Sequence, residues 1–586
     1  MKRILFALFI FLFSIKLMHI PSQFDFSVGR LPVLHDGRVK PIDSLARHEL
    51  LLIQGRLGLP DKSSPTSWYF NMLTRPGYSA SDSIILVEHP KLFDSIDRRY
   101  LKQKYRISEI FLDDNLELVF PFIQSASKLD KEERTPIQQA SYILSQRYSM
   151  VKDIRQQFFP YYDKSQLAFW NEMIALSQSL NDKNPQDSPE FIRFLEFYDE
   201  LVNYNSTLLF VFDDQWRTLT ETALDPMQQQ RNILSNYLLL SDSFQKSDLN
   251  NVKFYSYKLL QSFKAFSLSD YLIVHLEYFF NIINPFIVSL FIYFLIVLMV
   301  FFARFFNFAS FPTLIKDAWL ISLIFHTFGL VARSIILARP PVINLYSSAI
   351  FIAYVVSLIG YAMYAKNRQL FYAGYTSVLS LLTLIVAYHL SLSGDTLVVM
   401  QAVLNSNFWL STHVVSMTIG YAIILMAGFF AISYILMGTM TRLLTSDFEN
   451  RLSKLVYIFL MISLFFNFLG TVLGGIWADQ SWGRFWGWDP KENGAIMIVL
   501  WIAIILHMKW GKLLSNRWLM ILTVFSNIVT VWSWKGTNML GIGLHSYGFT
   551  EKTFYWLMIF FVTQIAIMVL AMIPKHLWLS FSNNDN

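Results

Sequence analysis

The sequence predicts an all-α polytopic membrane protein, with about nine C-terminal transmembrane helices, an N-terminal signal anchor and a mainly helical exported domain. Its 586 residues are 54% hydrophobic and only 15% charged, whereas soluble domains carry roughly 25% charged residues. Apolar runs recur from about Asn281 onward, near the length of about 20 residues that a bilayer requires. This composition argues against a nucleic-acid binder, a disordered chain and a coiled coil.

The first residues resemble an export signal. Lys2 and Arg3 precede an apolar run from Ile4 to Ile15, which is short for a span and suits a signal sequence or signal anchor within residues 1–19. No clear small-x-small cleavage site follows, which favours an uncleaved anchor. In either case we expect the next segment outside the cytoplasm.

Residues 20–280 form the expected exported soluble domain. They hold 28 basic against 33 acidic residues, and mixed helical patterns appear near 136–157 and 189–209. This part of the sequence has no glycine-rich phosphate loop, no metal-spaced histidine pair and no nucleophile elbow. Its role stays open at this point.

Residues 281–586 form the expected membrane domain, with 17 basic against 9 acidic residues. Apolar runs bounded by polar or basic residues predict nine spans. These lie near 282–302, 317–338, 343–365, 370–392, 408–438, 455–476, 494–508, 517–533 and 553–573.

The charged loops orient these spans. With the N-terminus in the cytoplasm, the inner loops carry eleven basic residues and the outer loops six, as the positive-inside rule requires. We therefore expect a bacterial inner (cytoplasmic) membrane protein. Its soluble domain and its loop 477–494 would lie on the periplasmic side.

That loop is rich in tryptophan and reads WADQSWGRFWGWDPKENG. Four tryptophans fall within twelve residues, namely Trp477, Trp482, Trp486 and Trp488. Tryptophan is common at any membrane interface, but an aromatic belt requires neither the intervening glycines nor an Asp-Pro-Lys-Glu run. Stacking faces beside the cations Arg484 and Lys491 suit a large planar ligand with anionic groups. Haem, with two propionates, is such a ligand.

Several motifs resemble one family. WGRFWGWDPKENGA is similar to the tryptophan-rich WWD signature of the haem-handling superfamily of cytochrome c maturation, and Lys491-Glu492 resembles its CcsA (ResC) branch, of system II. Within about residues 315–575, further motifs appear in the family's order: GLVAR at 329–333, RPPVINLY at 339–346, FWLSTH at 408–413 and GLHSYG at 543–548. The family pattern has Trp and Glu where this chain has Ser334 and Ser347, which puts the local packing there in question.

The resemblance implies a set of haem ligands. His413 and His545 occupy the positions that supply the external axial ligands in the family, and both are expected on the outer face. His507 occupies the position of a ligand for haem within the membrane, whose mate comes from the partner protein CcsB (ResB). His326, about midway along a span, is an alternative mate, and a hydrogen-bonded bundle histidine is the other interpretation.

Charged residues near the loop have two interpretations each. Arg333 and Arg339 either snorkel to the interface or help to hold haem propionates. Asp489 either orients the tryptophan segment or caps the helix that begins at Pro490. With Arg484 and the four tryptophans, Asp489 completes the residues expected to bind haem.

The resemblance implies cytochrome c haem attachment. Haem b, as substrate, would lie between His413 and His545 against Trp482, Trp486 and Trp488, with its vinyl groups facing the Cys-x-x-Cys-His thiols of apocytochrome c. The chain has no cysteine, so these thiols belong to the substrate. The implied enzyme is a haem lyase acting with a CcsB/ResB-type membrane protein.

Three alternatives stay open. The first is a haem exporter or carrier without ligation activity. The second is a system I synthase of the CcmF type, although its usual Trp-Asp-Pro-Val-Glu differs from residues 488–492, and the third is a transporter unrelated to haem. Residues 31–47 resemble a segment ahead of the membrane part of some longer CcsA-type proteins, and the exported domain could dock the apocytochrome, dock the partner or stabilise the fold.

Overall fold

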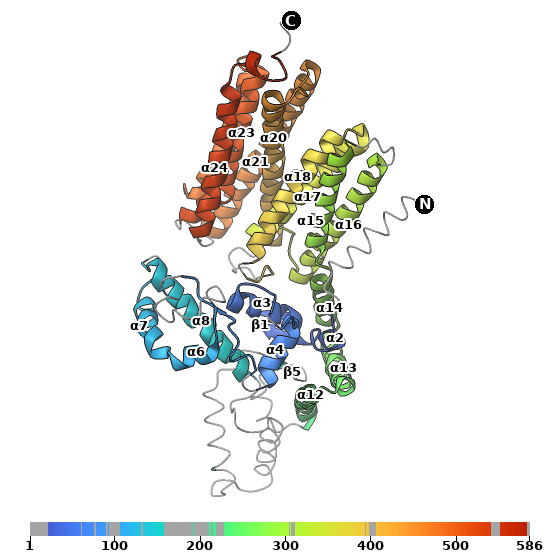
Figure 1. The fold of residues 1–586 in the computed structure, drawn as a ribbon, viewed down its shortest axis with the longest axis vertical. Coiled ribbons are helices and arrows are strands. Elements are labelled where there is room, and N and C mark those ends of the chain that lie inside the picture. The colour runs from blue at the N-terminus through green and yellow to red at the C-terminus, as the bar shows by residue number, and fades with distance from the viewer. Residues whose placement is uncertain are drawn as a thin grey trace. The chain divides into compact units, whose positions relative to one another are not determined.

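The structure is a computed structural model in which the chain divides into two compact units, each described by itself (Figure 1). The N-terminal unit comprises residues 19–283 and 392–399, and the membrane unit comprises 1–18, 284–391 and 400–586. The predicted signal segment and His545 lie outside the described residues. The described residues are 21–59, 61–75, 78–89, 92, 106–130, 133–157, 192, 210–212, 215–217, 228–303, 305, 311–392, 394–397, 406–540 and 551–582.

The N-terminal unit is mainly helical where it is described, with three two-stranded antiparallel sheets. Its helices are α2 (Gln23–Val28), α3 (Ile42–Gln54), α4 (Pro65–Thr74), α6 (Glu109–Asp114), α7 (Leu116–Ser127), α8 (Pro136–Gln156), α12 (Gln228–Gln245), α13 (Leu249–Phe266) and α14 (Leu268–Ile283). Its strands are β1 (Pro32–His35), β2 (Arg38–Pro41), β3 (Ile85–Leu86), β4 (Arg106–Ile107), β5 (Phe210–Phe212) and β6 (Gln215–Arg217).

Reciprocal capping boxes start two of these helices. Ser22 and Asp25 form a reciprocal capping box at α2, and Thr135 and Gln138 form another at α8, where Pro136 takes the first helical position. Helices α3, α4 and α8 then bury their apolar faces in one core that includes Trp68. The unit therefore has a hydrophobic core of its own.

The β1–β2 hairpin forms ion pairs with Asp395, which lies in a loop that connects two membrane helices in the sequence. Asp36 and Gly37 both have positive φ, as a two-residue type I′ turn requires. The buried side chains of Arg38 and Lys40 lie 3.5 and 3.6 Å from the Asp395 carboxylate, and Arg38 also pairs with Glu277. Burial alone would raise the pKa of Asp395, but these two cations outweigh it and hold its pKa below the usual range.

The membrane unit is built from long apolar helices. These are α15 (Pro285–Ala303), α16 (Phe311–Leu337), α17 (Leu345–Asn367), α18 (Leu370–Ser391), α19 (Asn407–Trp409) with the π-helix η3 (Leu410–Val414) and α20 (Val415–Met440), α21 (Ser446–Trp482), α22 (Pro490–Trp510), α23 (Asn516–Trp534), the 3₁₀ helix η4 (Gly536–Leu540), α24 (Glu551–Met572) and the 3₁₀ helix η5 (Lys575–Leu577). Among the described residues, eight helices are long and apolar enough to cross a membrane, so this is a multi-pass membrane protein.

One of the nine expected spans, 517–533, forms α23 but is not among these eight. Its buried side chains include Thr523, Ser526, Asn527, Thr530 and Ser533, which lower its mean hydropathy. These groups pair inside the protein, for example through the 3.0 Å hydrogen bond from Asn527 Nδ2 to Gln564 Oε1 of α24. Protein contacts therefore replace lipid contacts along much of α23.

Helix α20 is the centre of the membrane unit. It packs against α17, α21 and α23, and Figure 1 shows α20, α21, α23 and α24 alongside one another. In the membrane span that ends with α20, 72% of the most apolar 18-residue stretch is buried inside the protein. The corresponding share for α24 is 17%. A Cβ added at Gly428 would lie 1.9 Å from Oδ1 of Asn527, so α20 and α23 pack too closely there for any side chain.

We predict that Gly428→Ala lowers the stability of the detergent-solubilised protein by about 1–3 kcal/mol, because an overpacked core must shift backbone or side chains. Thermal unfolding measures the change. The control is Gly511→Ala, whose added Cβ would meet no atom nearer than 3.3 Å. Equal melting temperatures for the two variants would contradict the close packing of α20 on α23.

Candidate functional site

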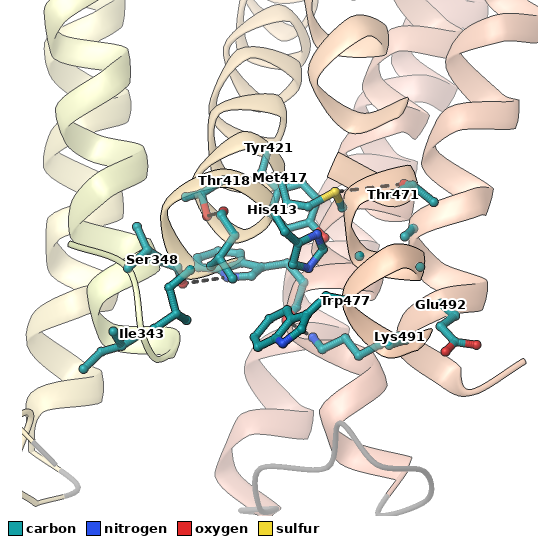
Figure 2. A pocket seen from close by; sticks show the side chains of 18 of the residues that line it. Ile343, Ser348, His413, Met417, Thr418, Tyr421, Thr471, Trp477, Lys491 and Glu492 are labelled. Atoms are coloured by element: carbon teal, nitrogen blue, oxygen red, sulfur yellow. Dashed lines mark hydrogen bonds between the residues drawn. The ribbon is translucent and has the colours of Figure 1, made fainter. Parts of the chain in front are cut away.

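A cavity of about 300 Å³ lies where the N-terminal ends of α17, α20 and α22 meet the C-terminal ends of α21 and α23 (Figure 2). Its size is at the lower end of the range for ligand pockets, about 300–1,000 Å³. Its walls are largely apolar. They include Leu410 and Met417 beside Trp477, Trp482, Trp486 and Trp534.

His413 enters this cavity from the π-helix η3. π-Helical turns are rare and often mark functional positions. The imidazole Nδ1 lies 2.7 Å from the carbonyl oxygen of Gly470. A carbonyl can only accept, so in the neutral ring Nδ1 carries the proton and Nε2 the lone pair. This tautomer suits a metal ligand whose orientation is fixed by its other nitrogen.

Helix α21 places Trp477 beside His413. The two rings meet edge to face with centroids 5.8 Å apart, and Figure 2 shows both side chains at the same cavity. A Cβ added at Gly474 would lie 2.6 Å from Cε1 of His413. Glycine at 474 therefore leaves the space that the imidazole occupies.

Hydrogen bonds to the first turn of α22 fix the backbone conformation at the end of the tryptophan loop. Asp489 is the N-cap and accepts hydrogen bonds from the backbone N–H groups of Lys491 and Glu492, which confirms the capping interpretation. In return, Glu492 Oε2 accepts from the N–H of Asp489 at 3.2 Å and from that of Gly487 at 2.7 Å. The Asp-Pro-x-Glu run is thus a complete capping box with proline at the first helical position.

The expected haem-stacking tryptophans separate into two groups. Trp477, Trp482 and Trp486 line the cavity. Trp488 does not line it and is 71% exposed, with φ of +58°. Its ring meets Trp486 edge to face at 5.9 Å, so it packs on the outer side of the loop.

The loop's glycines serve its own packing. A Cβ at Gly475 would lie 2.6 Å from the Phe485 ring, and one at Gly487 would collide with the guanidinium of Arg484. Arg484 therefore lies across the loop backbone, and it is not among the residues that line the cavity. Lys491 does line it, and its Nζ donates to the carbonyls of Ser533 and Trp534 at the end of α23.

Some residues that line this cavity have buried polar atoms without partners, which sequence reasoning missed. Oε1 of Glu492, Nε1 of Trp486 and both amide atoms of Asn538 have no hydrogen-bond partner, although all three residues line the cavity. Such atoms are costly to bury unless a ligand or water pairs with them. Asn538 lies in η4, and no motif distinguishes it from any other loop asparagine.

Ser347 explains one departure from the family pattern. Its N–H donates to Oδ1 of the N-cap Asn344 at 2.8 Å, and its hydroxyl accepts from the N–H groups of Ile343 and Asn344. This is a capping box with serine in the place usually taken by glutamate or glutamine. It orders the residues 342–345 that form the far wall of the cavity.

The remaining expected site residues lie elsewhere. His326 is buried, and both its nitrogens are hydrogen-bonded, Nδ1 to Tyr293 Oη at 3.3 Å and Nε2 to the Ile350 carbonyl at 3.0 Å, which favours the structural interpretation. Arg333 is buried over the Tyr346 ring, and Arg339 lies at the helix end near Asn407. Neither arginine lines the cavity.

His507 lies at the surface of the membrane unit. It is exposed on α22, with Nδ1 2.7 Å from the Ala503 carbonyl, so Nδ1 carries the proton in the neutral ring. Met497, Leu500 and Ile504 precede it at helical spacing and are each about half exposed. This face of α22 is therefore open to lipid or to a second membrane protein.

Comparison with known proteins decides the family. Residues 342–545 match the model of the family "Cytochrome C assembly protein". The chain is 30% identical over 260 residues to the cytochrome c biogenesis protein CcsA of Chlorella vulgaris, covering 38% of this chain and 82% of that protein. The chain belongs to the CcsA family.

Other relatives share a smaller part of their length. The chain is 29% identical to CcsA of Chlamydomonas reinhardtii over 219 residues, 36% of this chain and 61% of that protein. It is 28% identical to NrfI of Wolinella succinogenes over 226 residues, 38% of this chain and 25% of that protein. The CcsA similarity thus spans little more than a third of this chain.

We predict that Asp489→Ala destabilises this CcsA-family protein by about 1 kcal/mol, the usual cost of losing an N-cap. Thermal unfolding in detergent measures it. Asp479→Ala removes the same charge from an exposed position in the last turn of α21 and is the matched control. A loss no greater than that of the control would refute the capping role.

Proposed function

We propose that this protein acts in cytochrome c biogenesis by binding haem b as its substrate in the tryptophan-walled cavity and presenting it to apocytochrome c. The observation that carries the proposal is the position of His413, whose Nδ1 is engaged with the Gly470 carbonyl at the wall of that cavity. An imidazole with its lone pair on Nε2 is an axial ligand that haem iron accepts.

The cavity's composition fits such a ligand. Four tryptophan side chains offer apolar and stacking surface to a flat macrocycle, and Met417 and Leu410 extend that surface. Asn538 Nδ2 and Trp486 Nε1 are buried donors without partners, suited to the carboxylates of haem. Among the cations, Lys491 lines the cavity, whereas Arg484 does not.

We assign the second external ligand to His545, on its position in the family motif alone. With two imidazoles on the iron, the bound haem would be low-spin and protected. One of them could later give way to the histidine of the substrate's Cys-x-x-Cys-His segment. We place this site on the periplasmic side of a bacterial inner membrane, in accord with the loop charges.

We assign no general acid or base to this chain. In thioether formation a thiol adds across a vinyl double bond, so that sulfur bonds to one carbon and the thiol hydrogen ends on the other. Nothing is oxidised or reduced. Holding thiols and vinyl groups in register is a proximity effect, which can supply several kcal/mol of the barrier. We propose that the protein does this as a haem lyase, with a CcsB/ResB-type membrane protein as its partner.

The exposed face of α22 supports a partner within the membrane. His507 extends the apolar stripe formed by Met497, Leu500 and Ile504, so a packed partner would bury the stripe and the imidazole together. A ligating residue from the partner could then meet Nε2 of His507. His326, with both nitrogens already bonded, offers no such atom.

The first test is an absorption spectrum of the purified protein. We expect low-spin haem bands in the wild type and at least a tenfold loss of bound haem in His413→Ala, because an axial ligand is removed. His545→Ala should behave likewise. His389→Ala removes a histidine that does not line the cavity and should keep the spectrum. Low-spin bands that persist unchanged in both ligand variants would exclude the proposed site.

A second variant tests the orientation of the His413 imidazole and leaves the residue itself in place. Gly474→Ala keeps His413 but puts a methyl group where the imidazole packs, so haem content should fall in this variant too. Retention of wild-type haem would show that the ring does not need this orientation.

Lyase and carrier are distinguished by product. We expect thioether-linked haem on a co-expressed Cys-x-x-Cys-His reporter only when this protein and its partner are both present. Haem staining after denaturing electrophoresis detects the covalent product. Haem that leaves the membrane without thioether formation would favour the alternative, a haem exporter or carrier.

A further inference from the structure

The N-terminal unit contains a cavity of about 610 Å³ that the proposed function does not use. It lies between the β1–β2 turn and helices α3, α4 and α8, all of which belong to this unit. It has a buried floor, where Glu49 and Tyr69 lie, and an exposed mouth, where Ser149 and Asp153 lie. Solvent therefore reaches the mouth but not the floor.

Two helices turn polar faces toward each other across this space. On α8, Tyr142, Ser145, Ser149 and Asp153 recur at helical spacing and line the cavity. Opposite them, α3 presents His48 and Glu49. Packed helices normally bury apolar faces against each other, so a polar gap of this size indicates a space kept for something else.

The floor of the cavity has an orphaned carboxylate oxygen. Glu49 is 6% exposed, and its Oε2 has no hydrogen-bond partner. Its Oε1 lies 3.8 Å from His35 Nε2, which is a long contact. The Nδ1 of His48 is likewise buried without a partner. Buried polar atoms are seldom left unpaired, so these point to a ligand.

The charges of the residues that line the cavity indicate which charge the ligand carries. Asp36, Glu49 and Asp153 are carboxylates, and no lysine or arginine occurs among the described residues that line the cavity. Lys40, whose charge acts on Glu49, lies outside the lining and is paired with Asp395. No group of three His, Asp or Glu side chains in the described part of the chain could hold a metal ion. An organic cation fits this set better than an anion or a metal.

We propose that this cavity binds a protonated amine or a guanidinium group, with Glu49 as the counter-ion at its floor and Asp36 and Asp153 at its mouth. Such a group is rich in donors, as the orphaned oxygen of Glu49 requires. It can be carried by a small free amine or by a lysine or arginine side chain of a polypeptide. Both sources share this chemistry, and the test below separates them.

The titration of Glu49 gives the proposal a pH dependence. Burial raises its pKa to about 7, against the opposing pull of Lys40 and with support from Asp36 and Asp153. The other titratable groups that line the cavity are Tyr69 on α4, Tyr142 on α8, and His35 and His48, whose pKa values burial lowers. Glu49 gains its charge as pH rises through 7, whereas the two histidines, with pKa values below the usual 6.5, lose their charge at lower pH. Binding of a cation should therefore strengthen from pH 6 to pH 8.

The test uses the full chain in detergent and two matched probes, Nα-acetyl-lysine amide and the uncharged Nα-acetyl-norleucine amide. Binding of each probe is measured by ligand-observed NMR. We expect the lysine probe to bind at pH 8, more weakly at pH 6, and the norleucine probe not to bind. Glu49→Gln should weaken binding at least tenfold. The control Glu117→Gln removes the same charge from exposed α7 and should bind as the wild type does. Equal binding of both probes, or no effect of Glu49→Gln, would overturn the proposal.

A second variant guards against a folding defect at the buried site. Ser149→Lys adds a tethered ammonium at the exposed mouth of the cavity and should block the probe with Glu49 intact. Unimpaired binding in this variant would also overturn the proposal. n-Butylammonium and a lysine-containing pentapeptide form the two source arms: tighter binding of the peptide assigns the cavity to polypeptide side chains, and equal binding assigns it to the amine itself. Haem spectra of the same samples report the proposed function independently.

Discussion

The carboxylate of Glu492 holds the tryptophan segment in place. By accepting hydrogen bonds from the N–H groups of Gly487 and Asp489, it ties the loop backbone to the first turn of α22. The loop then has one course, in which Trp486 turns toward the cavity and Trp488 away from it. The geometry of the cavity on this side therefore depends on a helix cap that is formed within a few residues of sequence.

The opposite side of the cavity depends on close helix packing. His413 reaches the space between α20 and α21 because η3 redirects the chain and because Gly474 has no side chain. Its bond to the Gly470 carbonyl then fixes the imidazole on α21. A loop with a local cap and a helix pair with a tight contact thus meet, and neither alone forms the cavity.

Local features of the sequence were the predictable ones. Hydropathy located the helices of the membrane unit, and Asp before Pro indicated a cap at Asp489 as one of two interpretations, which the structure bears out. Features that depend on tertiary neighbours were not predictable. His326 finds Tyr293 and the Ile350 carbonyl only after three helices pack, and Asn538 meets the cavity only because η4 follows α23 there. Helix α23 was expected to be an ordinary membrane span, because the contacts that its buried polar face makes with other helices could not be predicted from the sequence.

The pairing of Asp395 with Arg38 and Lys40 bears on how such a chain can be divided. The loop 392–399 belongs to the N-terminal unit, although membrane helices flank it in the sequence. A cut near residue 283 would therefore not yield two self-sufficient modules, because it would leave the partly buried carboxylate of Asp395 without both of its counter-ions. Modular exchange of the N-terminal unit between proteins would require a matching change in this loop.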